Sequence, residues 1–164
     1  MKLRLTTTND LNAVMTIINQ AKKYFKEQGI NQWQDGYPNE NSIINDIDHQ
    51  EAYVLEINGE IVATAMISKA LEPNYNYIDG KWLQNANYIT VHRIAIRNDQ
   101  KGNGLAKIIM DEAAKLYPKL PSIRIDTHDD NLSMQHFLTK YGFTHCGTIY
   151  LENKETRRAY EKIL

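Results

Sequence analysis

The alternation of apolar and polar positions along the chain predicts a mixture of strands and helices. Alternating or apolar runs bounded by turn residues predict strands at residues 3–6, 52–57, 61–68, 88–96, 122–127, 144–150 and 156–164. Apolar positions spaced three and four residues apart predict helices from Asn9 or Asp10 to Lys26, over 41–49 and over 105–117. Residues 157–164, taken alone, would equally suit a helix.

Two connections between these elements carry signals of their own. Asn58-Gly59 joins the strands at 52–57 and 61–68, and this dipeptide is the strongest short-range signal for a tight hairpin turn. The connection from Glu72 to Asn87 is long, polar and aromatic. In a compact domain such a segment is more often functional than idle.

A glycine-rich turn, Asp99-Gln100-Lys101-Gly102-Asn103-Gly104-Leu105-Ala106, lies between the strand at 88–96 and the helix at 105–117. Such a turn gathers free backbone N–H groups and the positive end of a helix dipole, which together favour phosphate. Leu105 and Ala106 exclude a nucleotide-hydrolase loop, which needs Lys and then Ser or Thr, and Lys107 replaces the third glycine of a dinucleotide fingerprint. For two glycines alone, the plainer interpretation is a helix start at a sharp turn.

The turn and its neighbours resemble the GNAT superfamily of N-acetyltransferases. Asp99 to Gly104 resembles the acyl-CoA loop of that family, Gln/Arg-x-x-Gly-x-Gly/Ala, except that Asp99 replaces its first residue and puts an anion near the phosphates. Tyr88 to Ile96 resembles the fourth strand of the family. Asn131-x-x-Met134-x-x-Phe137-Leu138-x-x-x-Gly142-Phe143 matches its helix that ends in Gly-Phe. The resemblance spans Arg4 to the C-terminus, and it decides for a strand at 156–164.

The resemblance implies an α/β fold with the order β-α-α-β-β-β-α-β-α-β-β, a mixed sheet flanked by helices. It also implies that the fourth and fifth strands splay apart, and that the main chain of the fourth pairs with the pantetheine arm of acetyl-CoA. The Asn131 amide would steady the pantetheine and would also suit a helix cap. The implied acetyl-CoA contacts are Ile94, Ala95, Ile96, Asp99, Gln100, Lys101, Gly102, Asn103, Gly104, Leu105, Ala106 and Asn131.

The implied chemistry is transfer of an acetyl group from a thioester to an amine in a ternary complex. An ammonium must lose a proton before it attacks, and a neutral imidazole can accept that proton near pH 7. His92 is the candidate base, because its position resembles that of a histidine in arylalkylamine N-acetyltransferases. Strand alternation would put His92, Ile94 and Ile96 on one face, where a hydrogen-bonded core histidine is the alternative. The Ile94 N–H is expected to polarise the thioester carbonyl.

The general acid is where the sequence departs from the family pattern. Leu138 occupies the position at which many members carry a tyrosine that protonates the leaving thiolate. Tyr141 lies one turn later and is the expected substitute, with His128 and His136 as alternatives. A free thiolate has a pKa of about 8.5, so solvent could also supply the proton.

Residues in the irregular segments are expected to bind the acceptor. Aromatic rings beside a cleft supply an amphipathic wall and can hold a cationic amine over their faces, although any one ring could instead cover the core. As a group they favour a small or aromatic amine. Glu40, Asp46 and Asp79 could attract a cationic one, but nothing in the sequence fixes them in the cleft. The candidates are Trp33, Gln34 and Tyr37, together with Tyr75, Tyr77 and Trp82.

Two other chemical signals are interpreted as structural. Asp126-Thr127-His128-Asp129-Asp130 holds metal-binding residue types, but adjacent strand residues point to opposite faces, so we predict no metal site. Cys146 is the single cysteine, cannot form an internal disulfide and suits a reducing cytosol. We expect it to be a small apolar strand residue rather than a nucleophile.

Length and composition fit one compact enzyme domain over residues 1–164. The chain is 42% hydrophobic and 24% charged, which allows a proper core. Its net charge of -1, from 19 basic and 20 acidic residues mixed along the chain, gives no basic face for nucleic acid. No signal peptide and no run of about 20 apolar residues is present, so we expect no membrane association and a cytoplasmic location. Exposed end strands would allow a homodimer.

The sequence therefore predicts an acetyl-CoA-dependent N-acetyltransferase that acts on a primary amine of a small acceptor. A non-catalytic acyl-CoA-binding or sensor module is the first alternative, which Leu138 and Asp99 favour. A nucleotide-binding regulatory domain is the second. Only the enzyme predicts amine-dependent release of free thiol.

Overall fold

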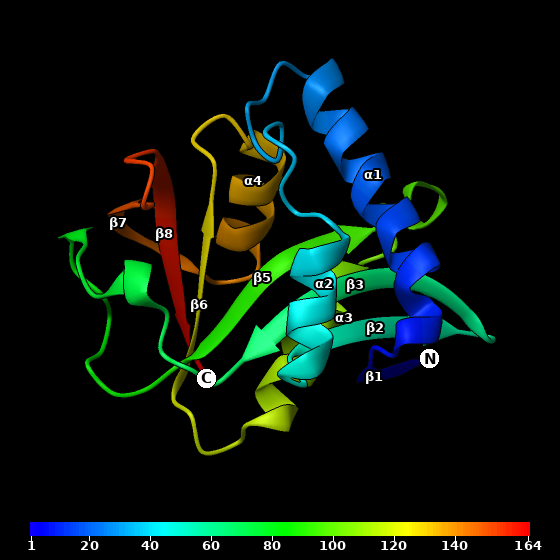
Figure 1. The fold of residues 1–164 in the computed structure, drawn as a ribbon. Helices are drawn as coiled ribbons and strands as arrows, with labels where there is room; N and C mark the ends of the chain where they lie inside the picture. Colours follow the sequence, from blue (N-terminus) through cyan, green and yellow to red (C-terminus); the bar gives the residue numbers. More distant parts are fainter. The chain divides into compact units, whose positions relative to one another are not determined.

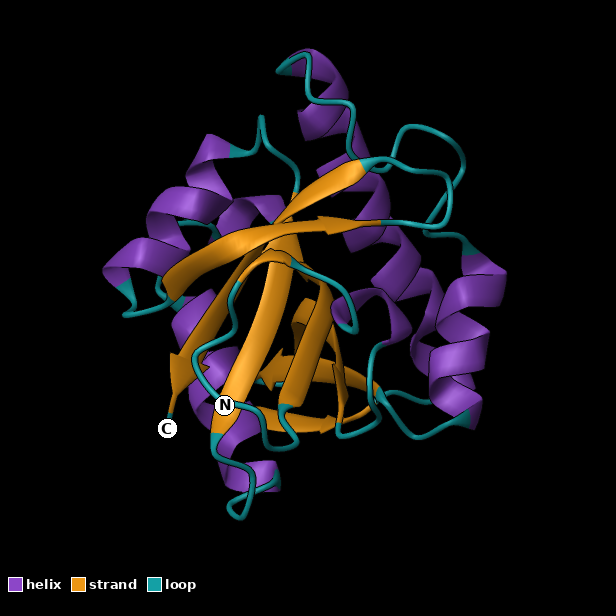
Figure 2. Cartoon of the chain, turned by 90° about the vertical axis from the view of Figure 1, so that its left-hand side faces the viewer, coloured by secondary structure: helices purple, strands orange, loops and turns teal.

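The computed structural model describes residues 1–164, which form both helices and strands (Figure 1, Figure 2). The strands are β1 (Lys2–Leu5), β2 (Ala52–Ile57), β3 (Glu60–Ser68), β4 (Asp79–Gly80), β5 (Ile89–Ile96), β6 (Ser122–Thr127), β7 (Thr144–Tyr150) and β8 (Thr156–Ile163). The helices are α1 (Leu11–Glu27), α2 (Glu40–Asp48), α3 (Leu105–Leu116) and α4 (Leu132–Lys140), with 3-10 turns at Thr8–Asp10, Pro73–Tyr75 and Asn98–Gln100. None of the helices combines the length and the apolar character that crossing a membrane requires.

The strands form a mixed sheet, as the resemblance implies. Its order is β1-β2-β3-β5-β6-β8-β7-β4. Strand β5 pairs with β6 in parallel, through Ile89 with Ile123 and Thr90 with Arg124. The pairs β1–β2, β2–β3, β6–β8, β7–β8 and β4–β7 are antiparallel. The predicted mixed α/β fold with flanking helices is therefore confirmed.

The elements predicted from the hydrophobic pattern are all present. The tight turn at Asn58-Gly59 is confirmed, with φ of 52° and 83° at its two central residues, both in the left-handed region that this turn requires. The segment at 156–164, which its own pattern left open between strand and helix, forms strand β8. Of the strands, the sequence prediction lacked only β4, inside the connection from Glu72 to Asn87.

Strand β4 depends on two glycines that let two backbones meet. Gly80 and Gly147 face each other in the β4–β7 pair, with φ of +138° and +148°. A Cβ on Gly80 would lie 2.2 Å from the Cys146 carbonyl oxygen, and one on Gly147 would lie 2.2 Å from that of Asp79. Only glycine permits such an approach, because no real Cβ contact is that short.

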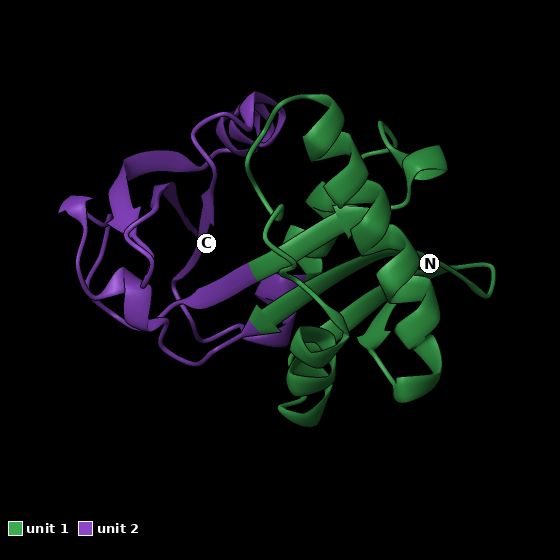
Figure 3. Cartoon of the chain, turned by 45° about the horizontal axis from the view of Figure 1, so that its top comes forward, with its two compact units in different colours: residues 1–67, 92–112 green, residues 68–91, 113–164 purple.

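The chain divides into two compact units (Figure 3). The first comprises residues 1–67 and 92–112, and the second comprises 68–91 and 113–164. In the first unit, α1 and α2 cover one face of the strands (Figure 1). Their shared core consists of Val14, Ile17, Ile18, Ile43, Val54 and Ala95, with Trp33 packed against it. A single domain over 1–164 stays a prediction.

The second unit is built around a buried ion pair. The Arg124 guanidinium lies 4.2 Å from the ring centroid of Trp82 and 4.1 Å from that of Tyr88. Its Nε donates to Glu161 Oε1 at 3.0 Å, and Glu161 is fully buried. Glu161 also accepts hydrogen bonds from the Leu83 N–H and the Gln84 amide. Because every charge in this cluster has partners, it fixes the connection from Glu72 to Asn87 onto β6 and β8.

A second charged cluster joins β1 to the start of α1 in the first unit. The Arg4 guanidinium binds Asp10 through two hydrogen bonds, Nη1 to Oδ2 at 2.8 Å and Nη2 to Oδ1 at 3.0 Å. Asp10 Oδ2 also accepts from the Thr7 N–H, which completes a capping box. These hydrogen bonds lower the pKa of Asp10 to about 2, and the bond from Arg4 has the largest effect.

We therefore expect Asp10→Asn to lower the free energy of unfolding by about 2 kcal/mol at neutral pH. The folded-state pKa of Asp10 lies below its unfolded value, so this stabilisation is complete above the unfolded pKa and is lost as the pH falls through the folded one. Urea unfolding of both proteins from pH 7 to pH 3 measures the difference. It should stay constant down to about pH 5 and then shrink. Asp48→Asn, which removes an exposed carboxylate, is the matched control and should change stability little.

Candidate functional site

Strand β5 bends at its fifth residue. Arg93 has a φ of 49°, in the left-handed region that residues with a side chain seldom adopt. Such a residue inside a strand interrupts the regular alternation of side chains and re-aims its neighbours. Val91 and Ala95 are buried, whereas His92 and Ile94 are half-buried. Arg93 between them is half-buried as well, so burial does not alternate through these three residues, and this interruption is a feature that the sequence did not reveal.

The side chain of Arg93 is tied to α2 and to the segment before it. Its Nε donates to Asp46 Oδ2 at 2.8 Å, and its Nη2 donates to Asp46 Oδ1 at 2.6 Å. Its Nη1 donates to the Tyr37 hydroxyl. Burial raises the pKa of the Asp46 carboxyl above its usual value, and the Arg93 guanidinium partly offsets that shift. Asp46 is only 3% exposed, and its carboxylate is paired with Arg93.

The glycine-rich turn after β5 is exposed and shaped by positive φ angles. Gly102 and Gly104 have φ of +82° and +75°, and a Cβ built on either would meet nothing within 4 Å. The Gly104 carbonyl accepts from the Ile108 N–H and so begins the hydrogen bonds of α3. The N–H groups of Gln100 and Lys101 donate to the carbonyls of Arg97 and Asn98. The donors that suit an anion therefore begin at Gly102.

The charge of Asp99 is balanced within the turn. Arg97 Nε donates to Asp99 Oδ1 at 2.7 Å, and Arg97 Nη2 donates to Asp99 Oδ2 at 3.0 Å. Arg97 Nη2 also donates to Glu60 Oε2 on β3, at 3.1 Å. The hydrogen bonds from Arg97 lower the pKa of the Asp99 carboxyl, so the acid is ionised and paired. The anion that departs from the family motif is thus compensated by a cation two residues earlier.

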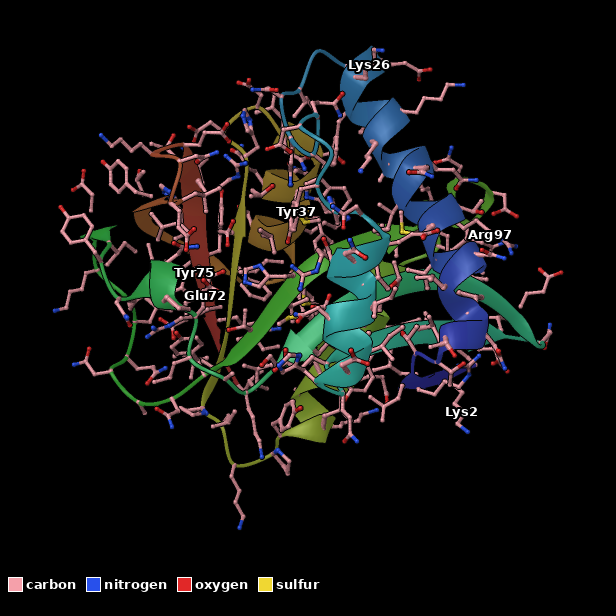
Figure 4. All side chains as sticks on the ribbon, in the orientation of Figure 1. Lys2, Lys26, Tyr37, Glu72, Tyr75 and Arg97 are labelled. Atoms are coloured by element: carbon pink, nitrogen blue, oxygen red, sulfur yellow. The ribbon has the colours of Figure 1, made fainter.

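The two lysines near the turn have partners inside the first unit. Lys101 Nζ lies 4.5 Å from the ring centroid of Tyr24 on α1, and burial lowers its pKa. Lys107 Nζ donates to Asp111 Oδ2 one turn along α3. The Asn98 N–H donates to Gln20 Oε1 on α1, so that helix supports the turn beside Arg97 (Figure 4).

The acceptor candidates of the first unit lie on the segment between α1 and α2. The Trp33 ring packs edge-on against Phe25 at 5.5 Å and joins the core. The Gln34 amide donates to the carbonyls of Lys22 and Gln32. Tyr37 is 42% exposed, with its hydroxyl bound by Arg93 (Figure 4). Of the two aromatic residues, Tyr37 has the more accessible ring.

The acceptor candidates of the second unit are held by that unit. Tyr75 is 3% exposed, and its hydroxyl donates to Asp126 Oδ2 at 2.6 Å. Burial first, and then the Asp126 charge, raises the pKa of Tyr75 well above its ordinary value. The Trp82 indole N–H donates to the Tyr75 carbonyl, and its ring covers Arg124. Tyr75 also lies beside Glu72, which accepts its N–H (Figure 4). Both rings are therefore committed to packing in this unit.

Helix α4 places the remaining predicted residues. Asn131 is its N-cap, with Oδ1 accepting from the Met134 N–H at 3.1 Å, so the capping role is confirmed. Leu138 is fully buried. The Tyr141 ring stacks on Phe137 at 5.8 Å, and Lys162 Nζ lies 3.5 Å from its centroid. Of the alternative donors, His136 is exposed, and His128 Nδ1 accepts from the Asp130 N–H.

Cys146 and the acidic stretch before α4 have ordinary structural surroundings. Burial raises the pKa of the Cys146 thiol to about 11, so little nucleophilic thiolate forms near neutral pH. Asp126 is bound by Tyr75, and Asp129 accepts from the Thr156 hydroxyl. The structure holds no group of three or more His, Cys, Asp or Glu side chains placed to bind a metal ion.

Comparisons with known proteins agree on one family. The model of the acetyltransferase (GNAT) family matches residues 16–143. A solved GNAT-family acetyltransferase from Streptococcus agalactiae is 38% identical, with a TM-score of 0.91, over 99% of this chain and 95% of that chain. Another from Listeria monocytogenes is 23% identical, with a TM-score of 0.76, over 99% and 94% of the two chains. A ribosomal-protein-alanine N-acetyltransferase from Brucella melitensis is 16% identical, with a TM-score of 0.70, over the whole of both chains.

These likenesses differ in weight. The two more distant structures show the fold alone, and none of the curated proteins compared with the chain matches it. The family model spans most of the sequence, including β5, the glycine-rich turn and α4, and the streptococcal relative covers nearly the whole chain. The chain therefore belongs to the acetyltransferase (GNAT) family.

Proposed function

We propose that this protein is an acetyl-CoA-dependent N-acetyltransferase that acetylates a primary amine of a small acceptor by direct attack. The observation that carries the proposal is the turn from Gly102 to Gly104, which is exposed, keeps positive φ angles and opens onto α3 directly after the bent strand β5. Membership of the GNAT family supports acyl transfer in general. The choice of acetyl group, of a nitrogen acceptor and of its size is the proposal.

The turn fits the diphosphate of coenzyme A. Gly102 and Gly104 leave open space where any other residue would carry a side chain, and the start of a helix favours an anion. The pairing of Asp99 with Arg97 removes the electrostatic objection to a phosphate nearby. Strand β5 pairs with β6 at its first two residues, Ile89 and Thr90. Because this pairing lies at the start of the strand, it supports Ile94, Ala95 and Ile96, farther along β5, as main-chain partners of the pantetheine arm. Asn103, Leu105 and Ala106 complete the proposed contacts of the turn, together with Gln100 and Lys101 at the rim, and a contact from Asn131 stays a prediction.

The residues of β5 would then carry the chemistry. Acetyl-CoA, when bound, supplies the acetyl group as a thioester, which an amine converts to an amide with release of the free thiol. His92 accepts the proton that the ammonium must lose, directly or through water. The Ile94 N–H donates to the carbonyl oxygen as negative charge develops there, which requires only a main-chain donor that is already aimed. Because that donor is backbone, a change of the Ile94 side chain should matter little to this step.

The proton for the departing thiolate comes from Tyr141 or from solvent. Leu138 is buried in the core and cannot donate. Tyr141 carries a phenol at the C-terminal end of α4, and the Lys162 ammonium that lies over its ring moderates the charge that would form on it. Solvent is sufficient if this step is fast.

The acceptor would bind against the segment that holds Trp33, Gln34 and Tyr37. Tyr37 supplies an exposed ring, and Trp33 and Gln34 fix the backbone beside it through the core and through α1. A role for Tyr75 and Trp82 stays a prediction, which their packing around Asp126 and Arg124 does not favour. An aromatic wall of this kind suits a small amine.

A non-catalytic acyl-CoA-binding module is the second candidate, favoured by the burial of Leu138 at the usual acid position. The deciding experiment has two parts. Thermal unfolding with acetyl-CoA, ATP and NAD identifies the cofactor, since a ligand at 100 times its dissociation constant adds about 2.7 kcal/mol. Release of free thiol from acetyl-CoA is then followed with phenethylamine, ethanolamine and spermidine. Amine-dependent release supports the enzyme, stabilisation without release supports the binding module, and stabilisation by ATP or NAD alone contradicts both.

A further inference from the structure

The bend in β5 has no local cause in the sequence. Glycine, asparagine and aspartate enter the left-handed region most readily, and arginine has no such preference. A residue with a side chain keeps a φ of 49° inside a strand only when its surroundings hold it there. The contacts of the Arg93 side chain are therefore the place to look for what fixes the bend.

The side chain of Arg93 contacts helix α2 and the residues just before it. Asp46 lies on α2, and Tyr37 precedes Asn39, which caps the same helix by accepting from the Ser42 N–H. The two-bonded fork between Arg93 and Asp46 has a fixed geometry, and only 14% and 5% of the two side chains is exposed. The Arg93 guanidinium carbon also lies 5.8 Å from the ring centroid of Tyr37. One side chain thus links the bend to the acceptor-side segment.

The residues on either side of the bend are those that the proposed function needs. His92 precedes Arg93 and Ile94 follows it, so the φ and ψ of Arg93 set the direction of the imidazole relative to the Ile94 N–H. We infer that Arg93, held by Asp46, is a positioning residue that fixes the bend of β5, and that the same guanidinium places the Tyr37 ring for the acceptor amine. This inference rests on the proposed function.

The test compares Asp46→Asn and Arg93→Lys with a matched control. Asp46→Asn keeps the shape and removes the charge, and Arg93→Lys keeps the charge and removes the fork. Asp10→Asn breaks another two-bonded arginine–aspartate pair of the same unit, formed with Arg4 on β1, which β2 and β3 separate from β5 in the sheet. Each protein is assayed well below its melting temperature, with acetyl-CoA and the most active amine of the panel above. The dissociation constant of acetyl-CoA is measured separately, without turnover.

We expect Asp46→Asn and Arg93→Lys to lower kcat by about 10- to 100-fold, because small misplacements of reacting groups are costly. The dissociation constant of acetyl-CoA should stay unchanged in both, and Asp10→Asn should keep the parent kcat. Tyr37→Phe keeps the ring but removes the oxygen that accepts from Arg93, so it should raise the KM for the amine more than it lowers kcat.

Two outcomes overturn the inference alone. The first is a kcat in both variants that equals that of Asp10→Asn. The second is a loss of acetyl-CoA binding in proportion to the loss of turnover, which indicates general disruption. A parent protein that binds acetyl-CoA but transfers nothing to any amine overturns the proposed function, and the inference with it.

Discussion

His92→Ala should lower kcat by about 100- to 10,000-fold, the range that a positioned general base contributes. The dissociation constant of acetyl-CoA should change little, because the proposed phosphate contacts lie in the turn at Gly102–Gly104 rather than at His92. Removal of the base should also abolish the fall in kcat at low pH that protonation of a base produces. Steady-state rates from pH 5 to pH 9, together with equilibrium binding of acetyl-CoA, measure both effects.

The control for this variant is His49→Ala. His49 follows α2 in the same unit and is exposed, so its removal eliminates an imidazole without touching β5. The control should keep the parent rate and pH profile. If His92→Ala turned over at the parent rate at every pH, the base would have to be another group, and His92 would be a structural residue of the strand.

Gly102→Val should weaken acetyl-CoA binding by about 10- to 100-fold, which corresponds to one lost hydrogen bond to a charged group. A β-branched residue does not tolerate a φ of +82°, so the turn must rearrange and its N–H groups must leave their present directions. No clash is involved, because a Cβ at this position meets nothing within 4 Å. Calorimetric titration with acetyl-CoA measures the change.

Gly59→Val is the matched control for this substitution. Gly59 has a φ of +83°, and its Cβ would also meet nothing, but it lies in the hairpin turn between β2 and β3. Both variants should lose comparable stability, and only Gly102→Val should lose cofactor affinity. Equal affinities in the two variants would contradict the placement of the diphosphate at the turn.

The elements of the fold could be predicted because each depends on a pattern within a few residues. Periodic apolar positions predicted α1 and α2, and Asn58-Gly59 predicted the β2–β3 hairpin. Strand β4 could not be predicted in this way. Its two residues form a strand only because Gly80 meets Gly147, which is distant in the sequence.

The site was less predictable, because its side chains depend on partners far along the chain. The bend at Arg93 is held by Asp46 and Tyr37, and the sequence around Arg93 contains no residue pattern that predicts it. The pairing of Asp46 with that arginine joins residues 47 positions apart, which no short motif predicts. Tyr75 and Trp82 were candidates for the acceptor site because they are aromatic. In the structure the Tyr75 hydroxyl donates to Asp126, and the Trp82 ring contacts Arg124. The roles of His92, Ile94 and Tyr141 stay predictions.

The pairing of Arg97 with Asp99 has a consequence for how loop motifs are recognised. A consensus that scores each position by residue type penalises this chain for an acid at the head of the loop. Summed over positions 97 to 99, the formal charge is zero, and Gly102 and Gly104 after them have positive φ angles. Screens for related sequences that tally net charge across neighbouring positions would therefore retain members that letter-by-letter matching discards.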